Sequence, residues 1–129
     1  MNLKFFLLIA VLFNCSIIFI SCNHANEYED IEVSILSTIN EERSLPNDPI
    51  STTWAIISYN IENLGTKKVN GWNIFFNVNL EKGPQIIASD YVAHVIEPGQ
   101  ISSLKKTSVL IPSYYEKATG AVLKDIDTW

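Results

Sequence analysis

The chain has 129 residues, of which 47% are hydrophobic and 11% aromatic, and its net charge at neutral pH is −5. This length suits one domain rather than two, and the apolar content is sufficient to form a buried core. The negative charge and the lack of a basic patch in the sequence argue against binding to a nucleic-acid backbone.

The N-terminal segment Met1–Ser21 has the pattern of a secretory signal peptide. Lys4 supplies a short positive region, and Phe5–Phe13 is an unbroken apolar run of secretory length. Asn14, Cys15 and Ser16 then interrupt the hydrophobicity, so a retained transmembrane helix of about 20 apolar residues fits less well.

The four residues Phe19-Ile20-Ser21-Cys22 resemble the lipoprotein box of bacterial signal peptides, although Phe19 stands where Leu is usual. The resemblance implies that Cys22 carries a lipid such as palmitate and becomes the first residue of the mature protein. It also implies an outer-membrane address, since Asn23 does not favour inner-membrane retention. The alternative is plain secretion, with Cys22 lying near a later cleavage site. Residues 22–30 are then the lipidated cysteine and an acidic tether.

The stretch Trp54–Leu80 predicts two strands around a polar turn. In the second strand, five apolar residues alternate with Asn73, Phe75, Asn77 and other mostly polar residues, which is typical of a half-buried strand. The five predicted core residues are Trp72, Ile74, Phe76, Val78 and Leu80. In the first strand, a face with Ala55, Ile57, Tyr59 and Ile61 opposes a face with Trp54, Ile56, Ser58 and Asn60.

Two turns have recognisable chemistry. In the connection Asn63–Asn70, Asn63 tolerates unusual backbone angles and Gly65 can take a positive φ, so this segment is either a tight hairpin or a link between two sheets. In Glu97-Pro98-Gly99, proline fixes the first corner and glycine gives freedom at the second.

The rest of the chain predicts further strands, separated by loops over 40–49 and 113–120. The expected strands are Ile31–Ile39, Ile50–Glu62, Val69–Glu81, Gln85–Val95, Gln100–Ile111 and Ala121–Trp129. We therefore expect an all-β fold over residues 31–129, an antiparallel immunoglobulin-like β-sandwich of six or seven strands.

Two family resemblances bear on function. Asn63-Leu64-Gly65, Val69-Asn70-Gly71-Trp72 and Glu97-Pro98-Gly99-Gln100 are similar to turns of immunoglobulin-like domains of bacterial envelope proteins, such as the FxLYD type. That resemblance implies binding or scaffolding without shared catalytic residues.

The segment 61–78 is also similar to family 2 carbohydrate-binding modules, where the tryptophan matching Trp72 belongs to the core. Platform tryptophans are expected in the loop before Ala55 and in two later loops, but Pro49–Thr53 lacks a tryptophan and none occurs between Trp72 and Trp129.

Exposed aromatic residues are the main candidates for a binding site, because Trp and Tyr bury large areas while keeping a polar group. The candidate ligand-binding residues are Trp54, Phe75, Tyr114 and Tyr115.

Catalytic and metal sites are less well supported by the sequence. Asp90 and His94 share a strand face, but no nucleophile elbow or metal-ligand motif accompanies them, and His94 reads as an exposed strand residue. Asp125 and Asp127 share a face and suit an edge strand better than a calcium loop.

The sequence thus predicts a non-enzymatic envelope lipoprotein, membrane-anchored through Cys22, with no cofactor. Its partner is expected to be another envelope protein or a polysaccharide. The alternative is a carbohydrate-binding module that uses exposed aromatics.

Overall fold

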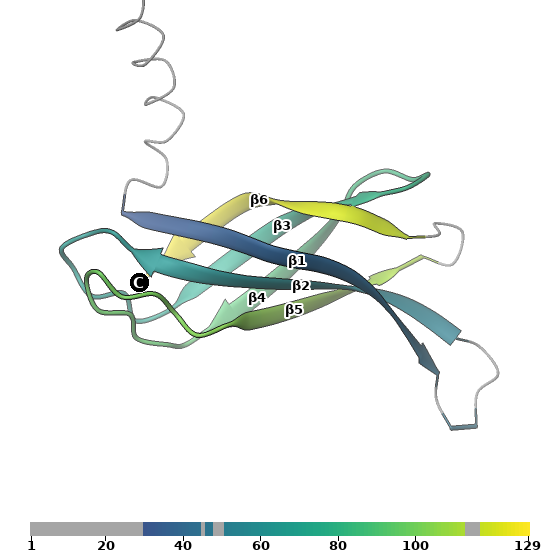
Figure 1. The fold of residues 1–129 in the computed structure, drawn as a ribbon, viewed down its shortest axis with the longest axis horizontal. Helices are drawn as coiled ribbons and strands as arrows, with labels where there is room; N and C mark the ends of the chain where they lie inside the picture. The colour runs from purple at the N-terminus through teal and green to yellow at the C-terminus, as the bar shows by residue number, and fades with distance from the viewer. Residues whose placement is uncertain (1–29, 45, 48–50, 113–116) are drawn as a thin grey trace, which may run out of the picture.

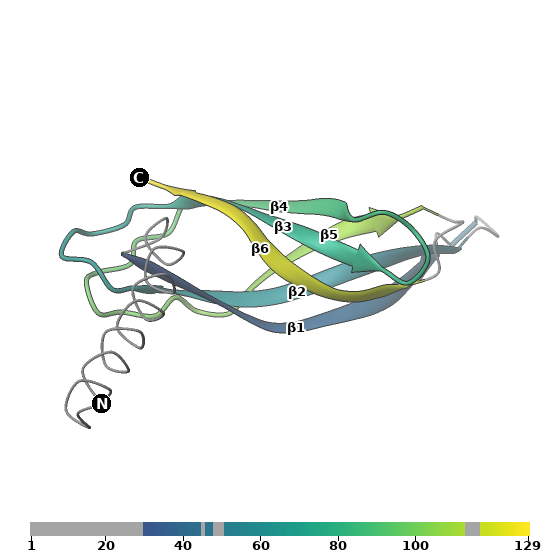
Figure 2. The ribbon, with the colours of Figure 1, turned by 90° about the horizontal axis from the view of Figure 1, so that it is seen from above.

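The computed structural model describes residues 30–44, 46–47, 51–112 and 117–129. Within these residues the fold is all-β, with six strands in two three-stranded antiparallel sheets of order β1-β2-β5 and β4-β3-β6. Figures 1 and 2 show the sheets as two layers. The strands are β1 (Ile31–Ser44), β2 (Ser51–Asn63), β3 (Trp72–Leu80), β4 (Ile86–Val92), β5 (Lys105–Ile111) and β6 (Ala118–Thr128).

The core lies between the layers and is formed by the two alternating faces that the sequence predicts. Trp72, Ile74, Phe76 and Val78 of β3 are fully buried, and Leu80 is nearly so. The predicted inward residues of β2 are also completely buried: Ala55, Ile57, Tyr59 and Ile61. Removing this much apolar surface from water is the main favourable term in folding.

The segment between β2 and β3 links the two sheets, which settles the alternative left open by the sequence. The expected backbone angles are wrong, because among the described residues positive φ occurs at Gly99 and at neither Asn63 nor Gly65. Asn63 acts through its buried side chain instead. Its Nδ2 donates to the carbonyls of Lys67 and Ile96, and its Oδ1 accepts from the Gly65 N–H. The Gly99 φ of 79° and the Gln100 N–H···O=C Glu97 bond confirm the other turn.

Five predicted strand limits need correction. β3 begins at Trp72 rather than Val69, and β4 ends at Val92 rather than Val95. β1 continues to Ser44 rather than ending at Ile39, because it pairs with β2 as far as Ser44↔Ser51. β6 begins at Ala118 rather than Ala121, since Ala118 pairs with Leu80. β5 begins at Lys105, whereas the sequence places its start at Gln100.

The sandwich is closed at both sides by side chains that reach across the sheet edges. Asn40, predicted to lie in a loop, belongs to β1 and points inward. Its amide donates to the carbonyl of Ala118 at 3.0 Å and accepts from the N–H of Ala118 at 2.8 Å. On the opposite side, the Thr107 hydroxyl of β5 donates to the Ser89 carbonyl of β4 at 2.6 Å. These bonds satisfy backbone groups at strand edges.

A short chain of hydrogen bonds crosses the core from sheet to sheet. The indole Nε1 of Trp72 donates to the Tyr59 hydroxyl at 3.1 Å, and that hydroxyl donates to Asp90 Oδ2 at 2.6 Å. The Tyr59 ring also packs against Phe76, with ring centroids 5.1 Å apart. Burial raises the pKa of the Tyr59 phenol, and the bond to Asp90 raises it further, while the bond from Trp72 opposes this.

Replacing Tyr59 with Phe should therefore weaken the fold, because the Trp72 N–H and the Asp90 carboxylate lose their shared partner. We expect a loss of about 1–3 kcal/mol in the free energy of unfolding, measured by urea denaturation at about pH 8.

The same variant should change the response to alkali. Above about pH 10 the unfolded tyrosine releases a proton that the folded protein retains, so wild-type stability falls as pH rises. The decline in urea midpoint between about pH 9 and pH 11 should be smaller in Tyr59→Phe. An equal decline in both proteins would show that the Tyr59 phenol does not contribute to it.

Candidate ligand-binding face

The outer surface of the sheet β4-β3-β6 carries half-buried or exposed aromatic, amide and carboxylate side chains. We call it the Tyr91 face. It comprises Asn73, Phe75, Asn77 and Asn79 of β3, Ile87, Ser89 and Tyr91 of β4, Val122, Asp125 and Asp127 of β6, and Trp129, which follows β6.

The strand register arranges these residues in rows across the sheet. The first row is Tyr91, Asn73 and Asp127, and the next is Ser89, Phe75 and Asp125; a third contains Ile87, Asn77 and Val122. Successive rows are two residues apart along each strand, or roughly 6.5–7 Å, and neighbouring strands are about 4.8 Å apart. The face is therefore a regular grid of side chains.

A β-bulge places both carboxylates on this face. Ala121 and Leu123 of β6 pack against the core, so strict alternation would also turn Asp125 and Asp127 inward. The register shifts by one residue at Lys124, after which Asp125 pairs with Phe75 and Asp127 pairs with Asn73 on the outer side. β6 is an edge strand of its sheet, as the sequence analysis expects from these charges.

Trp129 and Tyr91 form an exposed aromatic ledge at one end of the face. Their ring centroids are 5.0 Å apart and their planes differ by 24°, so the rings are stacked. Tyr91 is 71% exposed and Trp129 is 45% exposed. The Trp129 backbone is held by two hydrogen bonds, from its N–H to the Gly71 carbonyl and from the Asn70 N–H to its own carbonyl.

Gly71 makes room for the indole. A Cβ added to Gly71 would overlap the Trp129 ring and would lie 2.6 Å from the Val92 carbonyl oxygen. The ring therefore lies against the bare backbone of Gly71, so that an aromatic side chain covers the glycine that directly precedes β3.

Two amides on the face are available for a ligand. Among the residues that the structure describes, neither Asn73 nor Asn77 makes a side-chain hydrogen bond. Asn79, further along β3, instead accepts a hydrogen bond from Gln85. Each free amide can present two N–H donors and one carbonyl acceptor.

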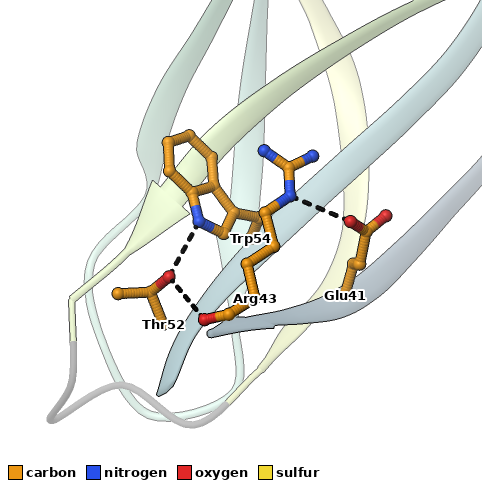
Figure 3. Close-up of polar contacts among 4 residues, drawn as sticks. All are labelled: Glu41, Arg43, Thr52 and Trp54. Atoms are coloured by element: carbon orange, nitrogen blue, oxygen red, sulfur yellow. Dashed lines mark hydrogen bonds and ion pairs between the residues drawn. The ribbon is translucent and has the colours of Figure 1, made fainter. Parts of the chain in front are cut away.

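The predicted candidate Trp54 lies on the outer surface of the other sheet, β1-β2-β5. The Arg43 guanidinium carbon lies 4.7 Å from the centre of its ring, and its Nε1 donates to the Thr52 hydroxyl at 3.0 Å (Figure 3). That hydroxyl donates to the Arg43 carbonyl at 3.1 Å, and Arg43 Nε also pairs with Glu41 at 2.9 Å. Trp54 is thus engaged by its own hairpin, β1-β2.

The other candidates separate as follows. Phe75 lies at the centre of the Tyr91 face and is half-buried. Tyr114, Tyr115 and the lipidation candidate Cys22 lie outside the described residues.

Sequence reasoning missed Tyr91 and Trp129 as a pair. It placed Ile87, Tyr91, Ala93 and Val95 on one face without assigning that face to the surface. In the structure these residues are exposed, and the inward side of β4 carries Ile86, Ala88, Asp90 and Val92. The available signal was the sequence Gly71-Trp72, because a glycine beside a core strand often marks a close approach.

In the structure, Asp90 and His94 contact different partners. Asp90 accepts the Tyr59 hydroxyl bond, whereas His94 contacts Trp72 edge-on, with ring centroids 6.1 Å apart. His94 follows the end of β4 and is half-buried, so its expected place as an exposed strand residue is wrong. Within the described ranges, no group of three or more His, Cys, Asp or Glu residues is suited to hold a metal ion.

Comparisons with family models, curated proteins and solved structures gave no match to this chain. In the part of the chain that the structure describes, no helix has the length and hydropathy needed to span a membrane.

The fit between Gly71 and Trp129 predicts that Gly71→Ala displaces the indole. We expect a red-shifted tryptophan emission and a loss of about 1–3 kcal/mol in unfolding free energy, because the added methyl group overpacks the site. Gly120→Ala is a matched control on the same sheet, since its added Cβ meets no atom within 4 Å. Equal spectra and stability for both variants would contradict the close packing of Trp129 on Gly71.

Proposed function

We propose that this protein is a non-enzymatic lipoprotein of the bacterial cell envelope whose β-sandwich is a binding domain. The lipid on Cys22 anchors it, in the outer membrane, and the Tyr91 face contacts the partner. The observation that carries the binding role is the stacked, exposed Tyr91–Trp129 pair. Aromatic residues held rigidly at a surface give contact area at a small entropic cost.

We further propose that the sandwich is immunoglobulin-like. In that fold, the first, second and fifth strands share one sheet, and the third strand pairs with the strand that follows the fifth. The orders β1-β2-β5 and β4-β3-β6 agree with this arrangement. Such a scaffold supports many unrelated binding functions, so the site rather than the fold must identify the ligand.

The strand arrangement relates the Tyr91 face to the proposed anchor. β1 begins at Ile31, which pairs with Asn63, and β6 ends beside Trp72 at Thr128, close to the C-terminal label in Figure 1. The Tyr91–Trp129 pair is therefore at the end of the sandwich where β1 starts. Eight tether residues, 23–30, extend at most about 28 Å, so this end would remain near the membrane.

The anchor is tested by the intact mass of the membrane-extracted protein. We expect a mature chain that begins at Cys22 and carries the added mass of acyl chains. These chains would hold it at the membrane, because each buried CH₂ adds about 0.8 kcal/mol to membrane binding. Cys22→Ala should abolish the added mass and release the protein from the membrane fraction, whereas Cys15→Ala, within the signal segment, should leave both unchanged. A wild-type chain without acyl mass, recovered as a soluble protein, would refute the lipoprotein assignment.

A further inference from the structure

We infer that the Tyr91 face binds a neutral polysaccharide, with sugar rings stacked on the Tyr91–Trp129 ledge and hydroxyl groups bonded to the amides of β3. This inference rests on the proposed binding function and names its ligand class. The stacking residues are now Tyr91 and Trp129, which the fold brings together, rather than the aromatic candidates favoured by the sequence.

The ledge provides the apolar half of such a site. The face of a sugar ring carries C–H bonds with slight positive charge, and the face of an aromatic ring is electron-rich, so the two attract when stacked. Trp129 stacks against one face of the Tyr91 ring, and the residue is still 71% exposed, so the remaining ring surface is open to a ligand. Trp129 is held from behind by Gly71 and by backbone hydrogen bonds, so little conformational freedom is lost when a ligand binds.

The β3 amides provide the polar half. Asn73 lies in the same row as Tyr91, and Asn77 lies two rows further along the strand. From the Asn73 row to the Asn79 row the face measures about 20 Å along β3, since each strand residue advances roughly 3.3 Å. A site with this shape suits an extended chain of several sugar rings, each able to exchange hydrogen bonds with amide donors and acceptors.

The negative charge of the Tyr91 face favours a neutral polysaccharide over an acidic one. Asp125 and Asp127 project from the same face, and the protein as a whole has a net charge of −5. Carboxylates accept hydrogen bonds from sugar hydroxyls, but they repel uronic acids, sulfated glycans and nucleic acids. The mixture of amides and carboxylates also differs from the centre of a typical protein interface, where charged residues are depleted.

The test uses the full chain, purified in a polyoxyethylene detergent that has no sugar head group. The immobilised protein is titrated with soluble β-glucan, xyloglucan, galactomannan and mannan, and with polygalacturonate as an acidic polysaccharide. We expect saturable binding to at least one neutral polysaccharide and none to polygalacturonate. Tyr91→Ala and Trp129→Ala should each raise the Kd at least tenfold, and Asn73→Ala should raise it about threefold to tenfold, as expected for a lost hydrogen bond.

Two variants on the opposite sheet serve as comparisons. Leu110→Ala removes an exposed apolar side chain beside Trp54 and should leave the Kd within about twofold. Trp54→Ala decides between the two outer faces and should have an equally small effect. Urea midpoints for every variant show whether the fold is retained.

The inference is overturned if no neutral polysaccharide binds to the wild-type chain, or if Trp54→Ala abolishes binding while Tyr91→Ala does not. Binding of an envelope protein on the Tyr91 face would also overturn it, while leaving the proposed function intact. A soluble chain without acyl groups that still binds polysaccharide would have the opposite meaning: the anchor fails and the ligand assignment stands.

Discussion

The hydrogen-bonded series Trp72–Tyr59–Asp90 is the constraint on which the rest of the structure depends. It joins β3 and β4 of one sheet to β2 of the other, inside an otherwise apolar core. Apolar contacts are non-directional and tolerate sliding, whereas a buried donor and acceptor must meet at a fixed distance. Tyr59 therefore sets how the two sheets are placed relative to each other, and it can do so because both of its partners are satisfied by the same hydroxyl.

The inner faces of the two sheets form the core, and the two outer faces differ in their chemistry. On β1-β2-β5, Trp54 is covered by Arg43 and bonded to Thr52, so its aromatic surface and its N–H serve the hairpin. On β4-β3-β6, the Trp129 ring lies between Gly71 and Tyr91 and is 45% exposed, while Tyr91 is 71% exposed. The bulge at Lys124 adds two carboxylates to the same surface. These differences explain why the proposals place the ligand on the Tyr91 face.

Much of the fold could be predicted from local sequence, because β3 has a large apolar side chain at every inward position and, Phe75 apart, a polar one at every outward position. The turn at Gly99 could also be predicted, since proline followed by glycine has few alternatives. The extension of β1 to Ser44 could not, because Asn40–Ser44 is polar and becomes a strand only through its pairing with β2.

The candidate site was less predictable for a related reason. β4 carries apolar residues on both faces, so periodicity does not say which face is buried. Asp90 is drawn inward by Tyr59, a residue 31 positions earlier, and Tyr91 is thereby turned outward. Trp129 depends on Gly71, which is even further away in the sequence. Contacts of this kind come from the tertiary structure, and no local pattern contains them.

The most direct test of the account is the response of the tryptophan indole N–H signals in a ¹H–¹⁵N NMR titration of the full chain with a polysaccharide that it binds. The three tryptophans report separately on the outer face of each sheet and on the core. The account predicts that the Trp129 signal shifts, while those of Trp54 and Trp72, which are bonded to Thr52 and Tyr59, stay in place. A shift of the Trp54 signal with the Trp129 signal unchanged would place the ligand on the outer face of β1-β2-β5 and contradict the account.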